Sequence, residues 1–561
     1  MRKVLVGLLC TVALGAFANP ADALLNRIDK GAAAKFKTVL VKSDKDFFEI
    51  DQAQKGNSTS AASKYDAGKN NPIIIRGNSW VNIAVGINWY LKHHAGIHIS
   101  WNNMNVKLPA VLPAVKQKER HETDLKLRYN FNYCTFSYTM AFWDWNRWQK
   151  EIDWMALHGI NMSLAAVGTE SVWRNMLLKL GYSEEEVGKF IAGPAFLAWW
   201  EMNNLEGWGG PLPLGWYKQQ EALQKKILAR MKEMGMKPVL PGYCGMVPHD
   251  AKQKLGLNVT DAGRWNSYQR PANLSPTDNR FAEIADLYYK ELTRLYGKSD
   301  YYSMDPFHES GNDAAVDYGK AGEALMSAMK RANPHAIWVV QGWNENPRPQ
   351  MIANLKVGDL LVLDLFSESR QNFEDFCTED NTSGTGKKNF STSKKEGIYG
   401  KHQWLFCLLE NFGGNVGLHG RMDQLLNNFY LATGKKDTPK QENSSLLTLH
   451  SSLKGWGFTM EGSENNPVMF ELMSELPWRA EKITKEDWIR EYCYARYGVH
   501  DATIEKAWTL LAQSIYNCPK GNIQQGTHES IFCARPSQNC YQVSTWSLMS
   551  NYYDPEDTRQ A

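Results

Sequence analysis

Beyond residue 125 the chain alternates short apolar runs with longer stretches that show helical periodicity. Eight apolar runs have the length of buried strands, at residues 129–134, 160–166, 238–243, 301–307, 337–343, 360–366, 404–409 and 456–460. Helical stretches separate most of them, at residues 145–158, 216–234, 280–296, 322–332 and 422–432. Strands that alternate with helices predict a parallel sheet, and eight of them predict a (β/α)8 TIM barrel over residues 125–482. Residues 182–208 form an insertion between the second and third strands.

Residues 24–124 have a different pattern and predict a small, separate α/β domain. Two strands are expected at Phe47–Ile50 and Pro72–Gly77, an amphipathic helix at Trp80–His93, and another strand at Ile97–Trp101. A basic run follows, with Lys116, Lys118 and Arg120, and it predicts a solvated linker or a sheet edge.

The pattern of the last segment, residues 483–561, predicts a C-terminal all-α domain. The predicted fold class is therefore α/β: a central barrel preceded by a small α/β domain and followed by a helical domain. Helices are expected over Glu486–Tyr497 and Ala502–Tyr516. Asp554 and Pro555 have the residue types of a helix N-cap and first position. Because the chain ends at Ala561, we expect this helical domain to be incomplete.

The first residues have the pattern of a secretory signal peptide, assigned to residues 1–23. Arg2 and Lys3 precede the apolar run Val4–Phe17, and cleavage is expected after Ala18 or Ala23. The short basic leader is of the bacterial type and predicts an exported protein, periplasmic or secreted. We find no other apolar stretch of about 18 residues, so no membrane span is expected.

Composition and charge narrow the class of ligand. A formal net charge of +3, with acidic and basic residues interspersed, gives no reason to expect nucleic acid as a partner. The 21 tryptophans favour a sugar ligand, because the C–H faces of sugars stack on aromatic rings. The alternative is a tryptophan-rich core.

The cysteines indicate neither a metal site nor a cofactor. Cys134, Cys244 and Cys407 lie in or beside apolar runs, where buried thiols are expected. A loop-rich stretch holds Cys518, Cys533 and Cys540, and export makes a disulfide among them an option. No Cys-x-x-Cys or His-x-x-x-His spacing occurs, so we expect no metal and no cofactor.

The predicted barrel would carry its chemistry where the strands end. The residues that follow the strands are mainly acidic, amide or aromatic: Asn132, Cys134, Glu170, His308, Glu309, Trp343, Asn344, Asp364, Glu368, Glu410, Asn411 and Glu461. Few Lys or Arg residues are expected at this mouth. Such a lining suits an uncharged sugar better than a phosphate.

A pair of carboxyls is the arrangement that glycoside hydrolysis requires. The segment Tyr301–Gly311 delivers Asp305 and Glu309 past a buried strand, where partial burial raises a carboxyl pKa towards neutrality. Strands four and eight lie opposite each other in a barrel, so Glu309 and Glu461 are expected to face each other. Glu309 and Glu410 form the alternative pair of catalytic carboxyls. Two simpler interpretations stay open: Asp305 and Glu309 cap the next helix, or the carboxylates are structural.

Several motifs resemble the exo-α-N-acetylglucosaminidases of glycoside hydrolase family 89. They are the segments Arg128–Cys134, Phe142–Trp145, Glu151–Leu157, Gly193–Trp199, Val340–Trp343, Leu361–Phe366 and Asn411–Asn415. They occur in order along nearly the whole chain after the leader. The resemblance implies the same three-domain organisation and a retaining mechanism that releases terminal, non-reducing α-linked N-acetylglucosamine.

The resemblance also implies roles for individual residues. Glu309 falls on the family's acid/base and Glu461 on its nucleophile. Seven residues fall on or beside sugar-binding positions: Asn132, Cys134, Trp199, Trp265, His308, Trp343 and His528. Other members carry Asn where this chain has His308, and both side chains can hydrogen-bond a hydroxyl. For Cys134 and Trp343 a role in core packing is the alternative.

Three hypotheses of function follow from the sequence. The first is a retaining exo-α-N-acetylglucosaminidase whose partner is a glycan. The second is a non-catalytic glycan-binding protein whose pocket stays open because the helical domain is short. The third is a glycosidase of different anomeric preference on the same barrel. The natural glycan, the disulfide pairing and the oligomeric state, a homo-oligomer included, are left open.

Overall fold

The computed structural model describes most of the chain after the leader. The described residues are 19–52, 71–307, 309, 316–344, 346–369, 373, 399, 401–410, 412–413, 417–435, 450–519 and 552–561. The predicted signal peptide up to residue 18, His308, Asn411, Cys533, Cys540 and His528 lie outside them.

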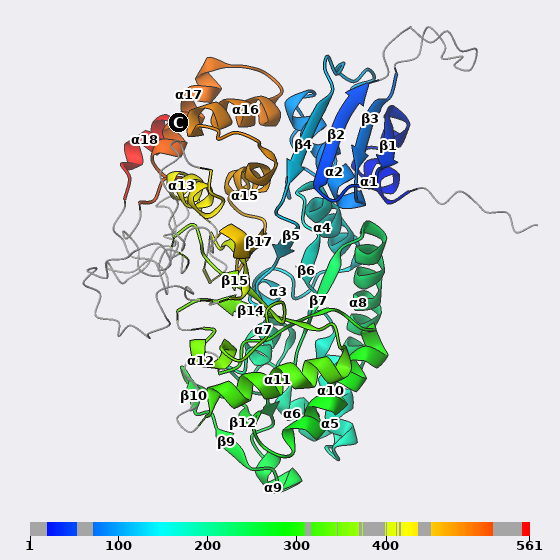
Figure 1. Ribbon diagram of the computed structural model, residues 1–561, viewed down its shortest axis with the longest axis vertical. Coiled ribbons are helices and arrows are strands. Elements are labelled where there is room, and N and C mark those ends of the chain that lie inside the picture. The colour runs from blue at the N-terminus through cyan, green and yellow to red at the C-terminus, as the bar shows by residue number, and fades with distance from the viewer. Residues whose placement is uncertain are drawn as a thin grey trace, which may run out of the picture.

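The N-terminal domain is a four-stranded sheet with helices packed against it (Figure 1). Its strand order is β1 (Phe36–Leu40), β3 (Ile73–Gly77), β2 (Asp46–Gln52) and β4 (Glu119–Thr123). Helix α2 (Trp80–His93) begins where the Ser79 side chain accepts a hydrogen bond from the Asn82 N–H. Gly86 lets α2 approach the sheet closely, since a Cβ there would lie 2.7 Å from Ile75. A shorter helix, α1 (Pro20–Ile28), precedes the sheet.

One predicted strand of this domain is wrong. Residues 97–101 form no strand, and only Ser100 makes an isolated bridge, with Asn103. Trp101 is buried by stacking on Trp154, with ring centroids 4.1 Å apart, so its burial comes from a barrel helix rather than from a sheet. The basic run leads instead into the edge strand β4, which confirms the prediction of an edge.

The central domain is a closed barrel of eight parallel strands, as predicted. In chain order the strands are β5 (Leu127–Asn130), β6 (Met162–Leu164), β7 (Lys237–Pro241), β13 (Tyr301–Ser303), β14 (Ile337–Gly342), β15 (Leu360–Asp364), β16 (Gln403–Leu408) and β17 (Leu453–Phe458). The last strand pairs with the first, Phe458 facing Asn130, and this closes the barrel. Strands four and eight, β13 and β17, stand opposite each other in this order.

Helices surround the barrel. They include α4 (Trp145–Leu157), α5 (Thr169–Lys179), α8 (Leu214–Met234), α10 (Phe281–Tyr296), α11 (Tyr318–Ala332), α12 (Pro349–Ile352), α13 (Met422–Ala432) and α15 (Pro467–Glu475). Five of them, α4, α8, α10, α11 and α13, lie where the sequence predicts them, whereas α5, α12 and α15 were not predicted. The first insertion holds α6 (Glu184–Phe190) and α7 (Leu197–Glu201). A second insertion, which the sequence did not indicate, carries β8 (Met246–Val247), α9 (Ala251–Leu255), β9 (Val259–Asp261), β10 (Arg264–Trp265), β11 (Tyr268–Gln269) and β12 (Ala272–Leu274).

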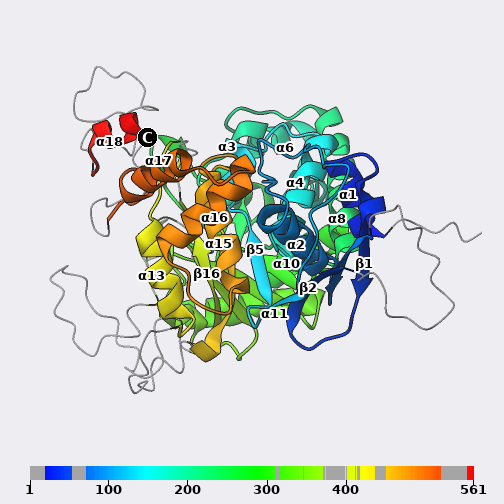
Figure 2. The same ribbon diagram turned by 90° about the horizontal axis from the view of Figure 1, so that it is seen from above.

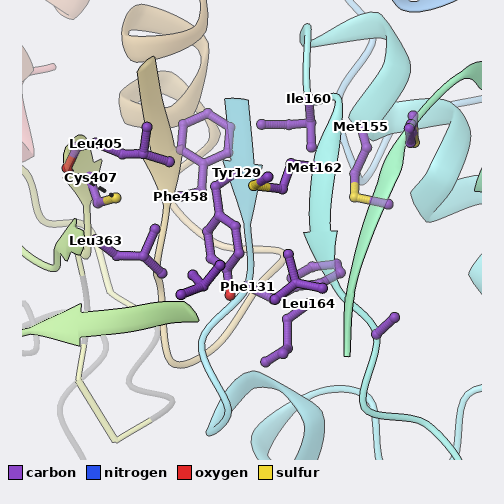
Figure 3. Close-up of a cluster of buried hydrophobic side chains, with 14 of the residues drawn as sticks. Tyr129, Phe131, Met155, Ile160, Met162, Leu164, Leu363, Leu405, Cys407 and Phe458 are labelled. Atoms are coloured by element: carbon purple, nitrogen blue, oxygen red, sulfur yellow. Dashed lines mark hydrogen bonds between the residues drawn. The ribbon is translucent and has the colours of Figure 1, made fainter. Parts of the chain in front are cut away.

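Apolar side chains fill the barrel. Figure 3 shows Tyr129, Met162, Leu363 and Leu405 converging from four strands, each almost without solvent exposure. Phe458 packs instead against Trp154 of α4 and Phe470 of α15. Many of the tryptophans belong to the core, since Trp148, Trp154, Trp200, Trp338, Trp404, Trp456, Trp478 and Trp488 are all fully buried. The alternative of a tryptophan-rich core therefore accounts for much, but not all, of the unusual aromatic content.

Of the described C-terminal helices, the first packs beside the N-terminal domain, as Figure 2 shows, the second contacts the first, and the third contacts the second. They are α16 (Lys485–Tyr497), α17 (Ala502–Gln513) and α18 (Pro555–Gln560). The predicted cap is confirmed, because the Asp554 side chain accepts from the Glu556 N–H. Helix α16 contacts α2, and the Tyr494 hydroxyl donates to the His94 carbonyl at 3.2 Å. Within the described residues, no helix combines the length and the apolar character that crossing a membrane requires.

Candidate functional site

Glu309 follows β13 at the barrel mouth and is held by three side chains. Its carboxyl accepts a hydrogen bond from Asn204 Nδ2 at 3.0 Å and another from Trp265. Arg270 Nη2 donates to the Glu309 carbonyl oxygen at 2.8 Å. The backbone of Glu309 is left-handed, with φ 48°, so these contacts hold a conformation that L-residues seldom adopt. Desolvation raises the pKa of Glu309, against the opposing effects of Trp265, Arg270 and Asn204.

The structure overturns the interpretation that Asp305 and Glu309 cap the next helix. Helix α11 is capped by Asp317, whose side chain accepts from the Lys320 N–H. Asp305 instead accepts from the Gln341 N–H at 2.9 Å, which ties the end of β13 to β14. Burial raises the pKa of Asp305 to about 7. Glu309 is therefore free of any capping role.

Glu461 follows β17, across the barrel from Glu309, and is half-buried. One of its carboxyl oxygens accepts a hydrogen bond from the Gly413 N–H, in the loop after β16. Burial, together with the negative charge of Glu309, raises the pKa of Glu461 to about 7, while the Gly413 bond opposes the shift. The negative charge of Glu309 therefore acts on Glu461 across the mouth of the barrel.

Glu410, the competing partner, lies in a different environment. Its side chain is 4% exposed, and neither carboxyl oxygen has a hydrogen-bond partner among the described residues. Burial and the neighbouring Glu368 carboxyl raise the pKa of Glu410 well above its usual range, which favours the neutral form of this carboxyl. Glu368 accepts the Glu410 N–H at 2.9 Å. A carboxyl closed off from solvent is a poorer partner for Glu309 than Glu461 is.

Cys134 and Asn132 lie at the end of β5, close to the carboxyl pair. Burial and the charges of Glu461 and Glu309 raise the pKa of the Cys134 thiol, which therefore stays protonated. The Asn132 side chain accepts from the Cys134 N–H at 3.0 Å and donates to the Thr459 carbonyl at 3.3 Å. Asn132 thus links strands one and eight, and its amide keeps one further N–H and lone pair for a ligand.

The predicted aromatic residues occupy the mouth with different degrees of exposure. Trp199, Trp265 and Trp343 are half-buried. Trp199 meets Tyr138 edge to face at 5.0 Å, and Trp265 hydrogen-bonds Glu309. Trp343 packs against the cluster of Leu365, Phe366 and Leu409, so a packing role contributes to its position. His308 and His528, the other predicted sugar-binding residues, lie outside the described residues.

Sequence reasoning missed several residues of the site. Arg270 corrects the expectation of a mouth with almost no basic residue, although its guanidinium is buried and serves Glu309 rather than solvent. Asn204, Gly413 and Tyr138 were also missed. Asn204 and Arg270 come from the two insertions, whose short elements carry no clear periodicity. The local sequence held no signal that they would meet Glu309.

One group of described residues offers the ligand atoms of a metal site, away from the carboxyl pair. His93, Glu475 and Glu491 each present an atom, all within 4.8 Å of one another. Arg479 already pairs with both carboxylates, at 2.7 Å and 2.5 Å, and Lys92 pairs with Glu475 at 2.5 Å. Because these cations already neutralise the two carboxylates, the site does not suit a divalent metal.

The fold and site together define a class: (β/α)8-barrel proteins with two carboxyls that follow opposite strands at the C-terminal mouth. Family models match all three domains: the α-N-acetylglucosaminidase (NAGLU) N-terminal domain at residues 19–114, its TIM-barrel domain at 128–480 and its C-terminal domain at 488–561. The chain belongs to the α-N-acetylglucosaminidase family.

Known relatives agree with this assignment. The chain is 34% identical to human α-N-acetylglucosaminidase over 499 residues, which is 86% of this chain and 62% of the human protein. It is also similar to a family 89 glycoside hydrolase from Clostridium perfringens, solved in complex with PUGNAc, with 31% identity and a TM-score of 0.83. That match covers 96% of this chain and 57% of the clostridial one. The clostridial protein has also been solved with its substrate GlcNAc-α-1,4-galactose. That structure is 30% identical to this chain, with a TM-score of 0.82, and the match covers 96% of this chain and 56% of the clostridial one. The chain thus spans less than two thirds of either relative.

Proposed function

We propose that this protein is a retaining exo-α-N-acetylglucosaminidase that removes terminal, non-reducing α-linked N-acetylglucosamine from glycans. The observation that carries the proposal is the placement of Glu309 and Glu461 after opposite strands of the barrel, where desolvation raises the pKa of both carboxyls. Such a pair can hold one proton and one negative charge near neutral pH, which is what double displacement needs.

In the proposed reaction the protonated Glu309 gives its proton to the glycosidic oxygen. The ionised Glu461 attacks the anomeric carbon at the same time, so the bond to the leaving sugar breaks and a glycosyl ester forms. Glu309, now ionised, removes a proton from water, whose oxygen displaces Glu461 and releases the sugar. The Gly413 N–H holds one oxygen of Glu461 and leaves the other for attack. Asn204 and Trp265 orient the Glu309 carboxyl.

We also propose that the protein is exported to the periplasm or the medium. Of the two expected cleavage points, the one after Ala18 is favoured, because α1 begins at Pro20 with Asn19 as its cap. Cleavage after Ala23 would remove this cap and the buried Ala21, leaving Leu24 at the new terminus.

The decisive test is hydrolysis of aryl α- and β-N-acetylglucosaminides by the purified protein. We expect chromophore release from the α-anomer alone, and proton NMR should show α-N-acetylglucosamine as the first product. Release from the β-anomer would favour the different anomeric preference, and a β-configured first product would indicate inversion. Binding of N-acetylglucosamine without release of any product would favour the non-catalytic glycan-binding protein.

Arg270→Lys is expected to impair proton donation more than the rest of the reaction. Arg270 is buried, and besides Glu309 it donates to the Asn203 carbonyl at 3.3 Å and to Asn204 at 3.4 Å. Lysine cannot make this fork of bonds. We expect kcat to fall about 100-fold on methyl α-N-acetylglucosaminide, a poor leaving group, and only a few-fold on the dinitrophenyl glycoside, which needs little protonation.

The matched control is Arg264→Lys, which changes an exposed arginine of the neighbouring hairpin. It should leave both rates unchanged. An equal loss on both substrates in Arg270→Lys would mean that Arg270 supports the fold in general rather than the position of Glu309.

A further inference from the structure

Six aromatic side chains form a continuous arc along one side of the mouth. Neighbouring ring centroids lie 5.0 Å apart for Tyr138–Trp199, 6.5 Å for Trp199–Phe196, 6.2 Å for Phe196–Trp208, 5.1 Å for Trp208–Tyr268 and 6.3 Å for Tyr268–Trp265. The rings come from the segment after β5 and from both insertions. Helices α3 (Thr135–Tyr138) and α7, which carry the first two rings, are in contact (Figure 1).

The two ends of the arc lie at the two carboxyls. Trp265 hydrogen-bonds Glu309. Tyr138 lies near Glu461, whose charge, together with burial, raises the pKa of the Tyr138 hydroxyl. The arc is therefore continuous with the proposed catalytic pair, and none of its six side chains carries a charge.

Trp208 stands out within the arc because it is exposed although its backbone is tightly held. Its side chain is 48% exposed. The Gly193 N–H donates to the Trp208 carbonyl at 2.8 Å, and the Gly207 N–H donates to the Phe190 carbonyl at 2.9 Å. A Cβ on Gly207 would lie 2.1 Å from the Lys189 carbonyl oxygen, so the loop closes where only glycine fits. An exposed indole on a rigid loop is pre-organised for a ligand.

We propose that Trp208 and Tyr268 form the binding platform for the sugar on the leaving-group side of the scissile bond, which is a neutral hexose. This inference rests on the proposed function. Glu309 protonates the oxygen that joins the two sugars, so the leaving sugar lies on the Glu309 side of the site. Trp265 contacts Glu309, Tyr268 is the cross-strand partner of Trp265, and Trp208 packs against Tyr268. A neutral sugar can stack its C–H face on these uncharged rings.

The test compares substrates with and without a leaving sugar. In Trp208→Ala, kcat/KM for N-acetylglucosaminyl-α-1,4-galactose should fall about tenfold, as expected for one lost stacking contact. The value for α-N-acetylglucosaminyl fluoride, whose leaving group has no ring, should stay within about twofold of wild type. Trp208→Phe should recover most of the loss. An equal change with both substrates, or no change with the disaccharide, would overturn the proposal.

Phe142→Ala is the matched control, since Phe142 is also exposed but contacts Trp216 rather than the arc. It should alter neither rate. If the wild-type chain hydrolyses neither substrate, the proposed function fails, and calorimetry of disaccharide binding then decides on the platform alone. Trp208→Ala should weaken binding of the disaccharide about tenfold and leave binding of N-acetylglucosamine unchanged. Equal weakening of both ligands, or of neither, would overturn the platform.

Discussion

Glu461→Gln is expected to lower kcat on an aryl α-N-acetylglucosaminide by about 10⁴-fold. Glutamine keeps the shape of the side chain, and its carbonyl oxygen can still accept the Gly413 N–H. It cannot attack the anomeric carbon, so no glycosyl intermediate forms. Steady-state kinetics with the purified chain measure the effect, and thermal unfolding shows that the variant remains folded.

Glu410→Gln is the control that separates the two candidate pairs. Burial raises the pKa of Glu410 and favours its neutral form, which an amide resembles, so the fold and the rate should change little. A large loss of activity in Glu410→Gln, with activity kept in Glu461→Gln, would make Glu309 and Glu410 the catalytic pair instead.

The largest expected effect on stability comes from Lys92→Met. Lys92 is 3% exposed and pairs with Glu471 and with Glu475, at 2.5 Å in the second case. The other oxygen of Glu471 lies 2.9 Å from His158 Nε2, and that of Glu475 accepts from Trp488 Nε1 at 3.0 Å. Loss of the lysine leaves two buried carboxylates without their main cation, which typically costs about 3–5 kcal/mol. Urea unfolding followed by tryptophan fluorescence measures the change in the free energy of unfolding.

The pH dependence of that change has a defined sign. Lys92 and its neighbours hold the pKa of Glu475 down at about 2 and that of Glu471 well below its usual value, against the effect of burial. In the wild type this stability is present above pH 4.5, the unfolded-state value, and is lost as the pH falls towards 2. Without Lys92, burial favours protonation of these carboxyls, so the variant gains relative stability on acidification. The difference in the free energy of unfolding between the wild type and Lys92→Met should therefore be larger at pH 7 than at pH 4.

Lys189→Met is the comparison for the stability measurement, because it removes an exposed ion pair with Glu185 on one helix. It should leave the unfolding midpoint unchanged. A similar small effect for Lys92→Met would show that the buried network does not stabilise the contact between the N-terminal domain and α15.

The local pattern of apolar and polar residues was sufficient to predict most of the fold. Apolar runs predicted all eight barrel strands, and helix α2 begins and ends at the predicted residues. Polar capping residues gave a correct helix start at Asp554, which is outside the barrel. Where several long-range contacts decided the outcome, the pattern failed. Ile97–Trp101 has the composition of a strand, yet Trp101 is buried against Trp154, which lies 53 positions later in the chain.

Some residues of the candidate site could likewise be predicted from the sequence, and others could not. Glu309 and Glu461 could be named from sequence because each directly follows a buried run, and a barrel sets the ends of strands four and eight opposite each other. Only the tertiary structure showed that Glu410 is closed off from solvent, that Asp317 caps α11, and that Asn204 and Arg270 hold Glu309.

The physical reason for this division is the distance along the chain over which each kind of interaction acts. Hydrophobic periodicity and helix caps act over a few residues, so the sequence by itself determined most of the elements, the barrel and the placement of Glu309 and Glu461 after opposite strands. Burial, ionisation and the support of a side chain depend on groups brought together from distant segments, such as Asn204 and Arg270 beside Glu309. Those contacts exist only in the folded chain, and they decide which carboxyls can hold a proton near neutral pH.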